Sequence, residues 1–235
     1  MRQSNGASPR CQGPPIERNT MSTCWIEDGQ TLLFIGDSIT DCGRRGADAP
    51  LGSGYARMTT EWITARYPEL DIRYINKGIG GNRITDLQNR WADDVLYHRP
   101  DRLSIKIGIN DLHSYLRAGE GAVSPQLFAE VYDELLARTQ SELGCPVVLL
   151  TPFYISTDRN PNSMRSQVLG LLPQYIETVV RMSEKYNTKL VRLHDIFQAH
   201  LARRDADTFC PEPVHPNHAG HMVIAQALAA QLGAA

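Results

Sequence analysis

Five short apolar runs, separated by segments with helical character, are the feature that most limits how this chain can fold. Buried parallel strands show continuous apolar runs of this kind rather than strict alternation of apolar and polar residues. We therefore predict strands at TLLFI (31–35), DIRYIN (71–76), RLSIKI (102–107), PVVLLT (146–151) and KLVRL (189–193).

Helices are expected between these strands and after the last one. Ser124 and Pro125 form an N-cap and first-turn pair, and Gly144 is a suitable end for the helix behind them. The other helical segments cover 54–67, 83–96, 166–186 and the region that follows Pro216. Regular alternation of strand and helix predicts a mostly parallel sheet covered on both faces, connected by right-handed crossovers.

The 235 residues suit one domain of this class, which we place at 23–235. The first 22 residues are polar, rich in Pro and Gly, and lack the apolar core of a signal peptide, so we expect a disordered tail (1–22) and a cytoplasmic protein. A net charge of −2, without blocks of like charge, indicates neither a nucleic-acid nor a membrane partner. Five cysteines without a C-x-x-C pair indicate free thiols.

A long segment, TPFYISTDRNPNSMRS (151–166), follows the fourth strand. We interpret it as too polar to belong to the core. Because it begins where a parallel strand ends, we expect it to border a ligand crevice at the carboxyl edge of the sheet.

Ser38 lies in GDSIT, directly after the first predicted strand. It can serve as a helix N-cap, as serine often does, or as a nucleophile. A phosphate-binding loop is excluded because no Gly-Lys-Ser/Thr follows at the required distance. The G-x-S-x-G elbow of α/β-hydrolases is also absent, because Thr40 stands where its second glycine would be.

Two further motifs follow the second and third strands. The glycine-rich stretch NKGIGGNRITDL (76–87) has Arg83 where a dinucleotide-binding loop needs its third glycine. It is therefore a plain turn, or a loop whose backbone N–H groups approach a ligand. Asn110 in IGIND can cap the next segment, or it can aim a neutral donor at an oxygen that gains negative charge.

Three histidines, His215, His218 and His221, precede or begin the last helix. Their spacing of three suggests a metal site, but His215 and His221 would point to different sides of a helix and no further ligands are evident. His215 stands just before Pro216, in a loop at the helix entrance. We predict that it is the one functional histidine, and that His218 and His221 are surface or supporting residues.

Taken in chain order, these motifs resemble the SGNH/GDSL hydrolase superfamily. The four residues that name the family map onto Ser38 in GDSIT, Gly81 in GGN, Asn110 in GIND and His215 in VHPNHAGH, and the resemblance spans roughly 25–232. The longer strings LLFIGDSITDCGR, YINKGIGGN, LTPFYI and VHPNHAGHMVIA resemble the bacterial GDSL-type acetylxylan esterases.

This resemblance implies a three-layer α/β/α fold with a flavodoxin-like, five-stranded parallel sheet. It implies a serine esterase that removes short acyl groups, most often acetyl, from xylan-derived or related carbohydrates, without cofactor or metal. The partner is then a small acylated carbohydrate, and the resemblance also allows for a homo-oligomer.

The implied roles are those of an acyl-transfer site. Ser38 attacks the ester, His215 takes its proton, and the N–H groups of Ser38 and Gly81 with the amide of Asn110 hold the oxyanion. The family normally has Asp three residues before the histidine, where this chain has Glu212.

Glu212 is our choice for the acid because its offset is right, ahead of the nearby Asp205 and Asp207. We expect Asp37 and Asp111 to be structural. Two alternatives are a non-catalytic or weakly active glycan-binding relative, prompted by Glu212, and a metal-dependent hydrolase that uses the histidines.

Overall fold

The computed structural model describes residues 24–119 and 122–234, so the expected tail (1–22) lies outside the described residues. Five parallel strands form one sheet in the order β2-β1-β3-β4-β5, which is the flavodoxin-like order predicted. The strands are β1 (Thr31–Gly36), β2 (Arg73–Gly78), β3 (Arg102–Lys106), β4 (Val147–Leu150) and β5 (Lys189–Val191). All five predicted strands are therefore confirmed.

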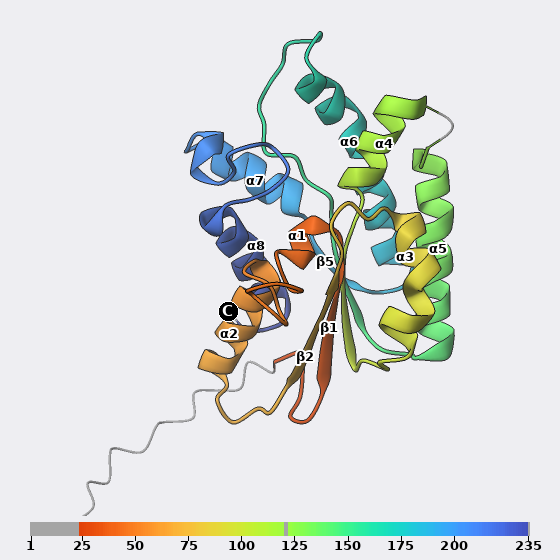
Figure 1. Ribbon diagram of the computed structural model, residues 1–235, viewed down its shortest axis with the longest axis vertical. Coiled ribbons are helices and arrows are strands. Elements are labelled where there is room, and N and C mark those ends of the chain that lie inside the picture. Colours follow the sequence, from red (N-terminus) through yellow and green to blue (C-terminus); the bar gives the residue numbers. More distant parts are fainter. Residues whose placement is uncertain (1–23, 120–121, 235) are drawn as a thin grey trace, which may run out of the picture.

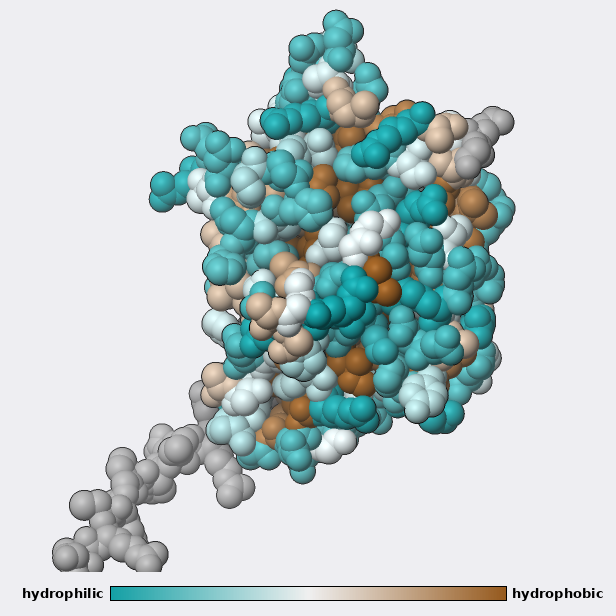
Figure 2. Space-filling model, viewed as in Figure 1, coloured by the Kyte–Doolittle hydropathy of each residue, from teal (hydrophilic) through white to brown (hydrophobic). Residues whose placement is uncertain are grey.

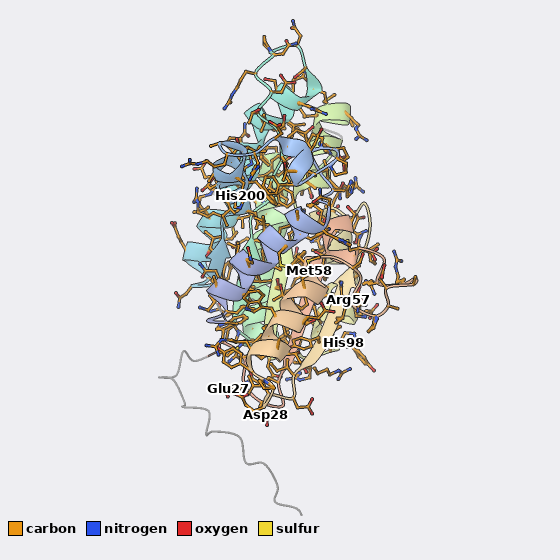
Figure 3. All side chains as sticks on the ribbon, turned by 90° about the vertical axis from the view of Figure 1, so that its left-hand side faces the viewer. Glu27, Asp28, Arg57, Met58, His98 and His200 are labelled. Atoms are coloured by element: carbon orange, nitrogen blue, oxygen red, sulfur yellow. The ribbon has the colours of Figure 1, made fainter. Side chains whose placement is uncertain are left out.

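Helices cover both faces of the sheet (Figure 1). They are α1 (Ser38–Asp41), α2 (Tyr55–Arg66), α3 (Ile84–Trp91), the π-helix η1 (Ala92–Leu96), α4 (Ile109–Ala118), α5 (Pro125–Glu142), α6 (Met164–Lys185), α7 (Leu193–Leu201), the 3₁₀ turn η3 (Ala206–Thr208) and α8 (His218–Gln231). One face carries α2, α7 and α8, and the other carries α3 to α6. Figure 3 shows α2 and α8 side by side, with Arg57 and Met58 on α2.

The helix boundaries follow the local signals. Ser124 Oγ accepts a hydrogen bond from the Leu127 amide at 3.1 Å, and Gly144 ends the segment at φ +64°. Asn217 caps α8 through its side chain, so that helix begins after His215, as expected. Helices α4 and α7 were not predicted.

The carboxyl ends of the strands meet at one edge of the sheet. Gly36 at the end of β1 pairs with Gly78 of β2 and with Lys106 of β3. Lys106 in turn pairs with Leu150 at the end of β4. This register brings the loops that follow β1, β2 and β3 to the same edge, where α1 lies in Figure 1.

The segment after β4 corrects one prediction. Residues 151–156 are buried, although we expected the whole insertion to be too polar for the core. Phe153 packs on Phe197 of α7 with ring centroids 4.8 Å apart, and the Ile155 amide donates to the Pro213 carbonyl at 2.9 Å. The first six residues of the insertion are thus core, and they hold the loop that leads to His215. The rest extends beyond the carboxyl edge of the sheet (Figure 1).

The outer surface is mostly hydrophilic, with small and separate hydrophobic patches on the face drawn in Figure 2. No helix in the described part of the chain combines the length and apolarity needed to span a membrane. The described cysteines Cys24, Cys42, Cys145 and Cys210 are free thiols, as predicted, and Cys11 lies outside the described residues.

Candidate active site

The turn after β1 presents Ser38. Asp37 is the N-cap of α1, and its Oδ1 accepts a hydrogen bond from the Ile39 amide at 3.0 Å. The alternative in which Ser38 is the cap is therefore wrong, whereas the backbone role expected for Asp37 is confirmed. The turn is tight, because a Cβ at Gly36 would lie 2.3 Å from the Lys106 carbonyl oxygen. As the first residue of the helix, Ser38 is free to direct its hydroxyl outward.

A hydrogen-bonded chain runs from Ser38 to Glu212. Ser38 Oγ lies 2.9 Å from His215 Nε2, and His215 Nδ1 lies 2.5 Å from Glu212 Oε1. The two side chains of the second contact are 58% and 47% exposed, so the site is open to solvent. The arrangement allows a proton to move from the hydroxyl to the imidazole while the carboxylate faces the far ring nitrogen.

Glu212 is held in place by the backbone as well as by His215. Its Oε1 accepts from the His215 amide at 2.8 Å and its Oε2 from the Val214 amide at 3.0 Å. Partial burial alone would raise the pKa of Glu212, but these two amides and the His215 ring together lower it below its ordinary value. Among the described residues, neither Asp205 nor Asp207 forms a hydrogen bond or ion pair with His215.

The loop after β2 packs against Ser38. A Cβ at Gly80 would lie 3.9 Å from Ser38 Cβ, and one at Gly78 would lie 2.2 Å from the Asp41 amide nitrogen. Gly81 has φ +79°, and its N–H has no acceptor among the described residues. The glycines thus allow a close approach of two backbones and leave one N–H unused beside the serine.

Asn110 lies in the first turn of α4, whose N-cap is Gly108, so the alternative in which Asn110 caps this helix is wrong. Its Nδ2 donates to the Asn82 carbonyl at 3.1 Å, which uses one of its two hydrogens. Gly81 and Asn110 line the same cavity, of about 370 Å³. The structure therefore brings together both neutral donors that the sequence singled out, as an oxyanion site requires.

A buried ion pair stabilises the turn between β1 and α1, which carries Ser38. Lys106 Nζ lies 3.1 Å from Asp37 Oδ2, and both side chains are 0% exposed. Burial lowers the pKa of Lys106, while Asp37 opposes that effect. The Lys106 ammonium also lies 5.0 Å from the centre of the Phe153 ring. Sequence reasoning missed this pair, although a lysine inside the apolar run RLSIKI was a signal for it.

Asp111 joins α4 to the loop that carries Gly81. It is fully buried, and its Oδ1 accepts from the Ile84 amide at 2.8 Å, at the start of α3. Its Oδ2 has no partner among the described residues, and burial raises its pKa to about 7. This contact accords with the structural role expected for Asp111.

His221 is buried rather than exposed, whereas His218 is on the surface. The Nδ1 atom of His221 accepts a hydrogen bond from the Tyr55 amide at 3.2 Å, and its Nε2 atom lies 3.3 Å from Cys42 Sγ. Both ring nitrogens are therefore engaged, one by the end of α1 and the other by the start of α2. Among the described residues, no group of three or more His, Cys, Asp or Glu side chains is placed to hold a metal ion.

His221 should make stability depend on pH. Burial lowers its pKa to about 4, and His218, Lys106 and His215 act in the same direction. In the unfolded chain the histidine has its ordinary pKa of about 6.5 and binds a proton at pH values where the folded protein keeps it neutral. The free energy of unfolding should therefore fall by about 3 kcal/mol as the pH drops from about 6.5 to 4.

Urea unfolding of the wild type and of His221→Gln at pH 7 and pH 4 measures this effect. The raised pKa of Asp111 acts in the opposite sense over this range, but it is common to both proteins and cancels in their difference. We expect the wild type to lose about 3 kcal/mol more than the variant between the two pH values. If the difference in free energy of unfolding between the two proteins is the same at both pH values, the role given to His221 is contradicted.

Comparison with known proteins places these features in a family. Residues 34–223 match the model of the GDSL-like lipase/acylhydrolase family. The chain is 36% identical over 225 residues to an acetylxylan esterase of Geobacillus stearothermophilus, which covers 88% of this chain and 96% of that protein. The crystal structure of Axe2, an acetylxylan esterase from the same organism, matches with a TM-score of 0.81 and 35% identity, covering 89% of this chain and 96% of the other.

Two further comparisons concern the relatives' own residues and class. Solved catalytic mutants of Axe2 replace a serine, an aspartate and a histidine with alanine, and the aspartate lies three residues before the histidine. The α/β hydrolase LAE5, from the metagenome of Lake Arreo, matches with a TM-score of 0.81 and 33% identity over 90% of this chain and 99% of that one. The chain thus belongs to the GDSL-like lipase/acylhydrolase family and is a carboxylic ester hydrolase.

Proposed function

We propose that this protein hydrolyses acetyl esters on xylan-derived oligosaccharides or related carbohydrates, through Ser38, His215 and Glu212 and a covalent acyl-enzyme. The observation that carries the proposal is the continuous hydrogen-bond chain among these three residues at the carboxyl edge of the sheet. The acetylxylan esterase from Geobacillus stearothermophilus supports the substrate class.

The reaction would proceed in two halves. Ser38 Oγ attacks the ester carbonyl as its proton passes to His215 Nε2, and Glu212 stabilises the imidazolium that forms. The tetrahedral oxyanion accepts hydrogen bonds from the amides of Ser38 and Gly81 and from Asn110 Nδ2. Its collapse breaks the bond between the acyl carbon and the sugar oxygen, which takes the proton from His215 and leaves as a hydroxyl group. Water, deprotonated by His215, then attacks acetyl-Ser38 and releases acetate.

The position of Glu212 supports its role as the acid of this set. It occupies the offset at which Axe2 has the aspartate altered in one of its catalytic mutants. Its chain is one methylene longer than that of aspartate, and two backbone amides in addition to the imidazole hold its carboxylate. Those contacts fix the longer side chain in one position.

A screen of substrates tests the proposal directly. Acetylated xylo-oligosaccharides should be hydrolysed with a higher kcat/KM than esters of the same sugars with longer acyl chains. If longer-chain esters are hydrolysed with the higher kcat/KM, the proposed specificity for acetyl groups is wrong. If simple aryl acetates are hydrolysed but acetylated sugars are not, the proposed specificity for carbohydrates is wrong.

Replacing Asn110 with alanine should lower kcat by about 10²- to 10³-fold, because one oxyanion donor is lost. The hydrogen bond to the Asn82 carbonyl is lost too, so the free energy of unfolding should fall by about 1 kcal/mol. Steady-state hydrolysis of p-nitrophenyl acetate and thermal unfolding measure the two effects. Asn89→Ala, an exposed asparagine on α3, is the matched control. A near-normal kcat in Asn110→Ala would exclude the proposed role.

A further inference from the structure

One face of α4 extends outward from the predicted oxyanion site. His113, Ser114 and Arg117 follow Asn110 by three, four and seven residues, which places all four on the same side of the helix. They line the cavity of about 370 Å³ that also contains Gly81 and Arg83. At about 1.5 Å per residue, Arg117 lies about 10 Å along the helix axis from Asn110.

The far end of this cavity is cationic. The exposed guanidinium of Arg117 forms no hydrogen bond or ion pair with another residue in the described ranges. Arg83, the N-cap residue of α3, also lines the cavity, with its side chain 40% exposed and its Nε 3.3 Å from Asp86. None of the described residues that line the cavity is acidic. Its walls therefore offer two guanidinium groups whose planar donor sets match a carboxylate.

His113 lies on α4 between Asn110 and Arg117, and the charges of Arg117, Glu212 and His215 all act on its ring. Burial lowers its pKa, and Arg117 and then His215 act in the same direction, whereas Glu212 opposes them. Because its pKa is lowered below the ordinary value, the ring is neutral at pH 7. It then provides both a donor and an acceptor for hydroxyl groups. It also contacts the edge of Tyr154, with ring centroids 6.0 Å apart.

We propose that this cavity binds a carboxylate carried by the substrate on a sugar next to the acetylated one, so that acetylated oligosaccharides with a uronic acid unit are preferred. The inference rests on the proposed esterase function and narrows its substrates to acetylated oligosaccharides that carry a uronic acid. The distance between Asn110 and Arg117 favours a charge on the neighbouring sugar, because a carboxylate on a short acyl group would remain beside the oxyanion donors.

Two acetylated xylo-oligosaccharides that differ only by one glucuronic acid branch provide the test. We expect the wild type to show at least a tenfold higher kcat/KM for the acidic oligosaccharide, mainly through KM, because charge-assisted hydrogen bonds are the stronger ones. In Arg117→Met the ratio of the two kcat/KM values should fall about tenfold, and Arg117→Lys should retain part of it. Added salt should also reduce the wild-type ratio, because Arg117 is exposed.

Arg138→Met is the matched control, since Arg138 lies on α5 and pairs with Glu142 outside the cavity. A wild-type ratio near one, or an unchanged ratio in Arg117→Met, overturns the inference while hydrolysis of the neutral oligosaccharide leaves the esterase proposal intact. If the gain appears instead with p-nitrophenyl hemisuccinate, the charge lies on the acyl side and the inference is wrong. If the wild type hydrolyses none of these esters, the proposed function fails, and this inference fails with it.

Discussion

Replacing Ser38 with alanine should abolish ester hydrolysis, with kcat reduced by about 10⁴- to 10⁶-fold. The reason is that His215 Nε2, 2.9 Å from Ser38 Oγ, has no other hydroxyl to activate in the hydrogen-bond chain described. The fold should persist, because Asp37 rather than Ser38 caps α1. Release of p-nitrophenol from p-nitrophenyl acetate measures the loss, and thermal unfolding checks the fold.

Ser141→Ala is the matched control for this experiment, because Ser141 is an exposed serine on α5 whose hydroxyl donates to the Arg138 carbonyl of its own helix. The wild type should also show a burst of p-nitrophenol if an acetyl-enzyme accumulates. Undiminished hydrolysis in Ser38→Ala would remove Ser38 from the mechanism. Sensitivity of the wild type to chelators would favour a metal-dependent hydrolase, and inactivity towards every ester would favour a glycan-binding protein.

Replacing Glu212 with alanine should lower kcat by about 10³- to 10⁴-fold, far more than Asp207→Ala. The loss removes the carboxylate that lies 2.5 Å from His215 Nδ1, so the ring is no longer oriented and its charged form is no longer stabilised. The Asp207→Ala variant should change kcat by less than threefold. The described contact of Asp207 near the site is made by its backbone carbonyl, which accepts from Asn217 and is kept in the variant. Both variants are compared with p-nitrophenyl acetate over a range of pH.

Glu212→Gln separates the two contributions of this residue, because glutamine keeps the length of the side chain and removes its charge. We expect it to retain more activity than Glu212→Ala but much less than the wild type. The lowered pKa of Glu212 means that the wild type should keep this carboxylate ionised well into the acid range. A larger effect of Asp207→Ala than of Glu212→Ala would overturn the assignment.

Much of the fold follows from local patterns. The five strands were predicted because a buried parallel strand is apolar on both faces, whatever its neighbours are. Helix α4 was missed because IGIND begins by continuing the apolar character of β3. The strand ends at Lys106, and the chain turns into the helix at Gly108, with φ +129°. The burial of 151–156 was missed because it depends on distant partners, namely Phe197 and Pro213.

The candidate site shows the same division. Its members were predicted from their order along the chain and the family resemblance which that order carries, because each motif alone had another explanation. Their catalytic roles are still predictions. The Lys106 pair with Asp37 was not anticipated, since a lysine within a strand pattern does not reveal which carboxylate it meets. The cationic lining of the cavity depends equally on tertiary structure, because Arg83 and Arg117 come from different elements.

The sequence by itself determined the fold class and the chain order of Ser38, Gly81, Asn110 and His215, because burial patterns and turn residues act over a few positions of the chain. Only the tertiary structure decided that Asp37 caps the helix and releases Ser38, and that Glu212 rather than Asp205 or Asp207 contacts His215. Ser38 and His215 are 177 positions apart. Their contact is set by the register of the sheet and by the packing of the loop before α8, which no local pattern encodes.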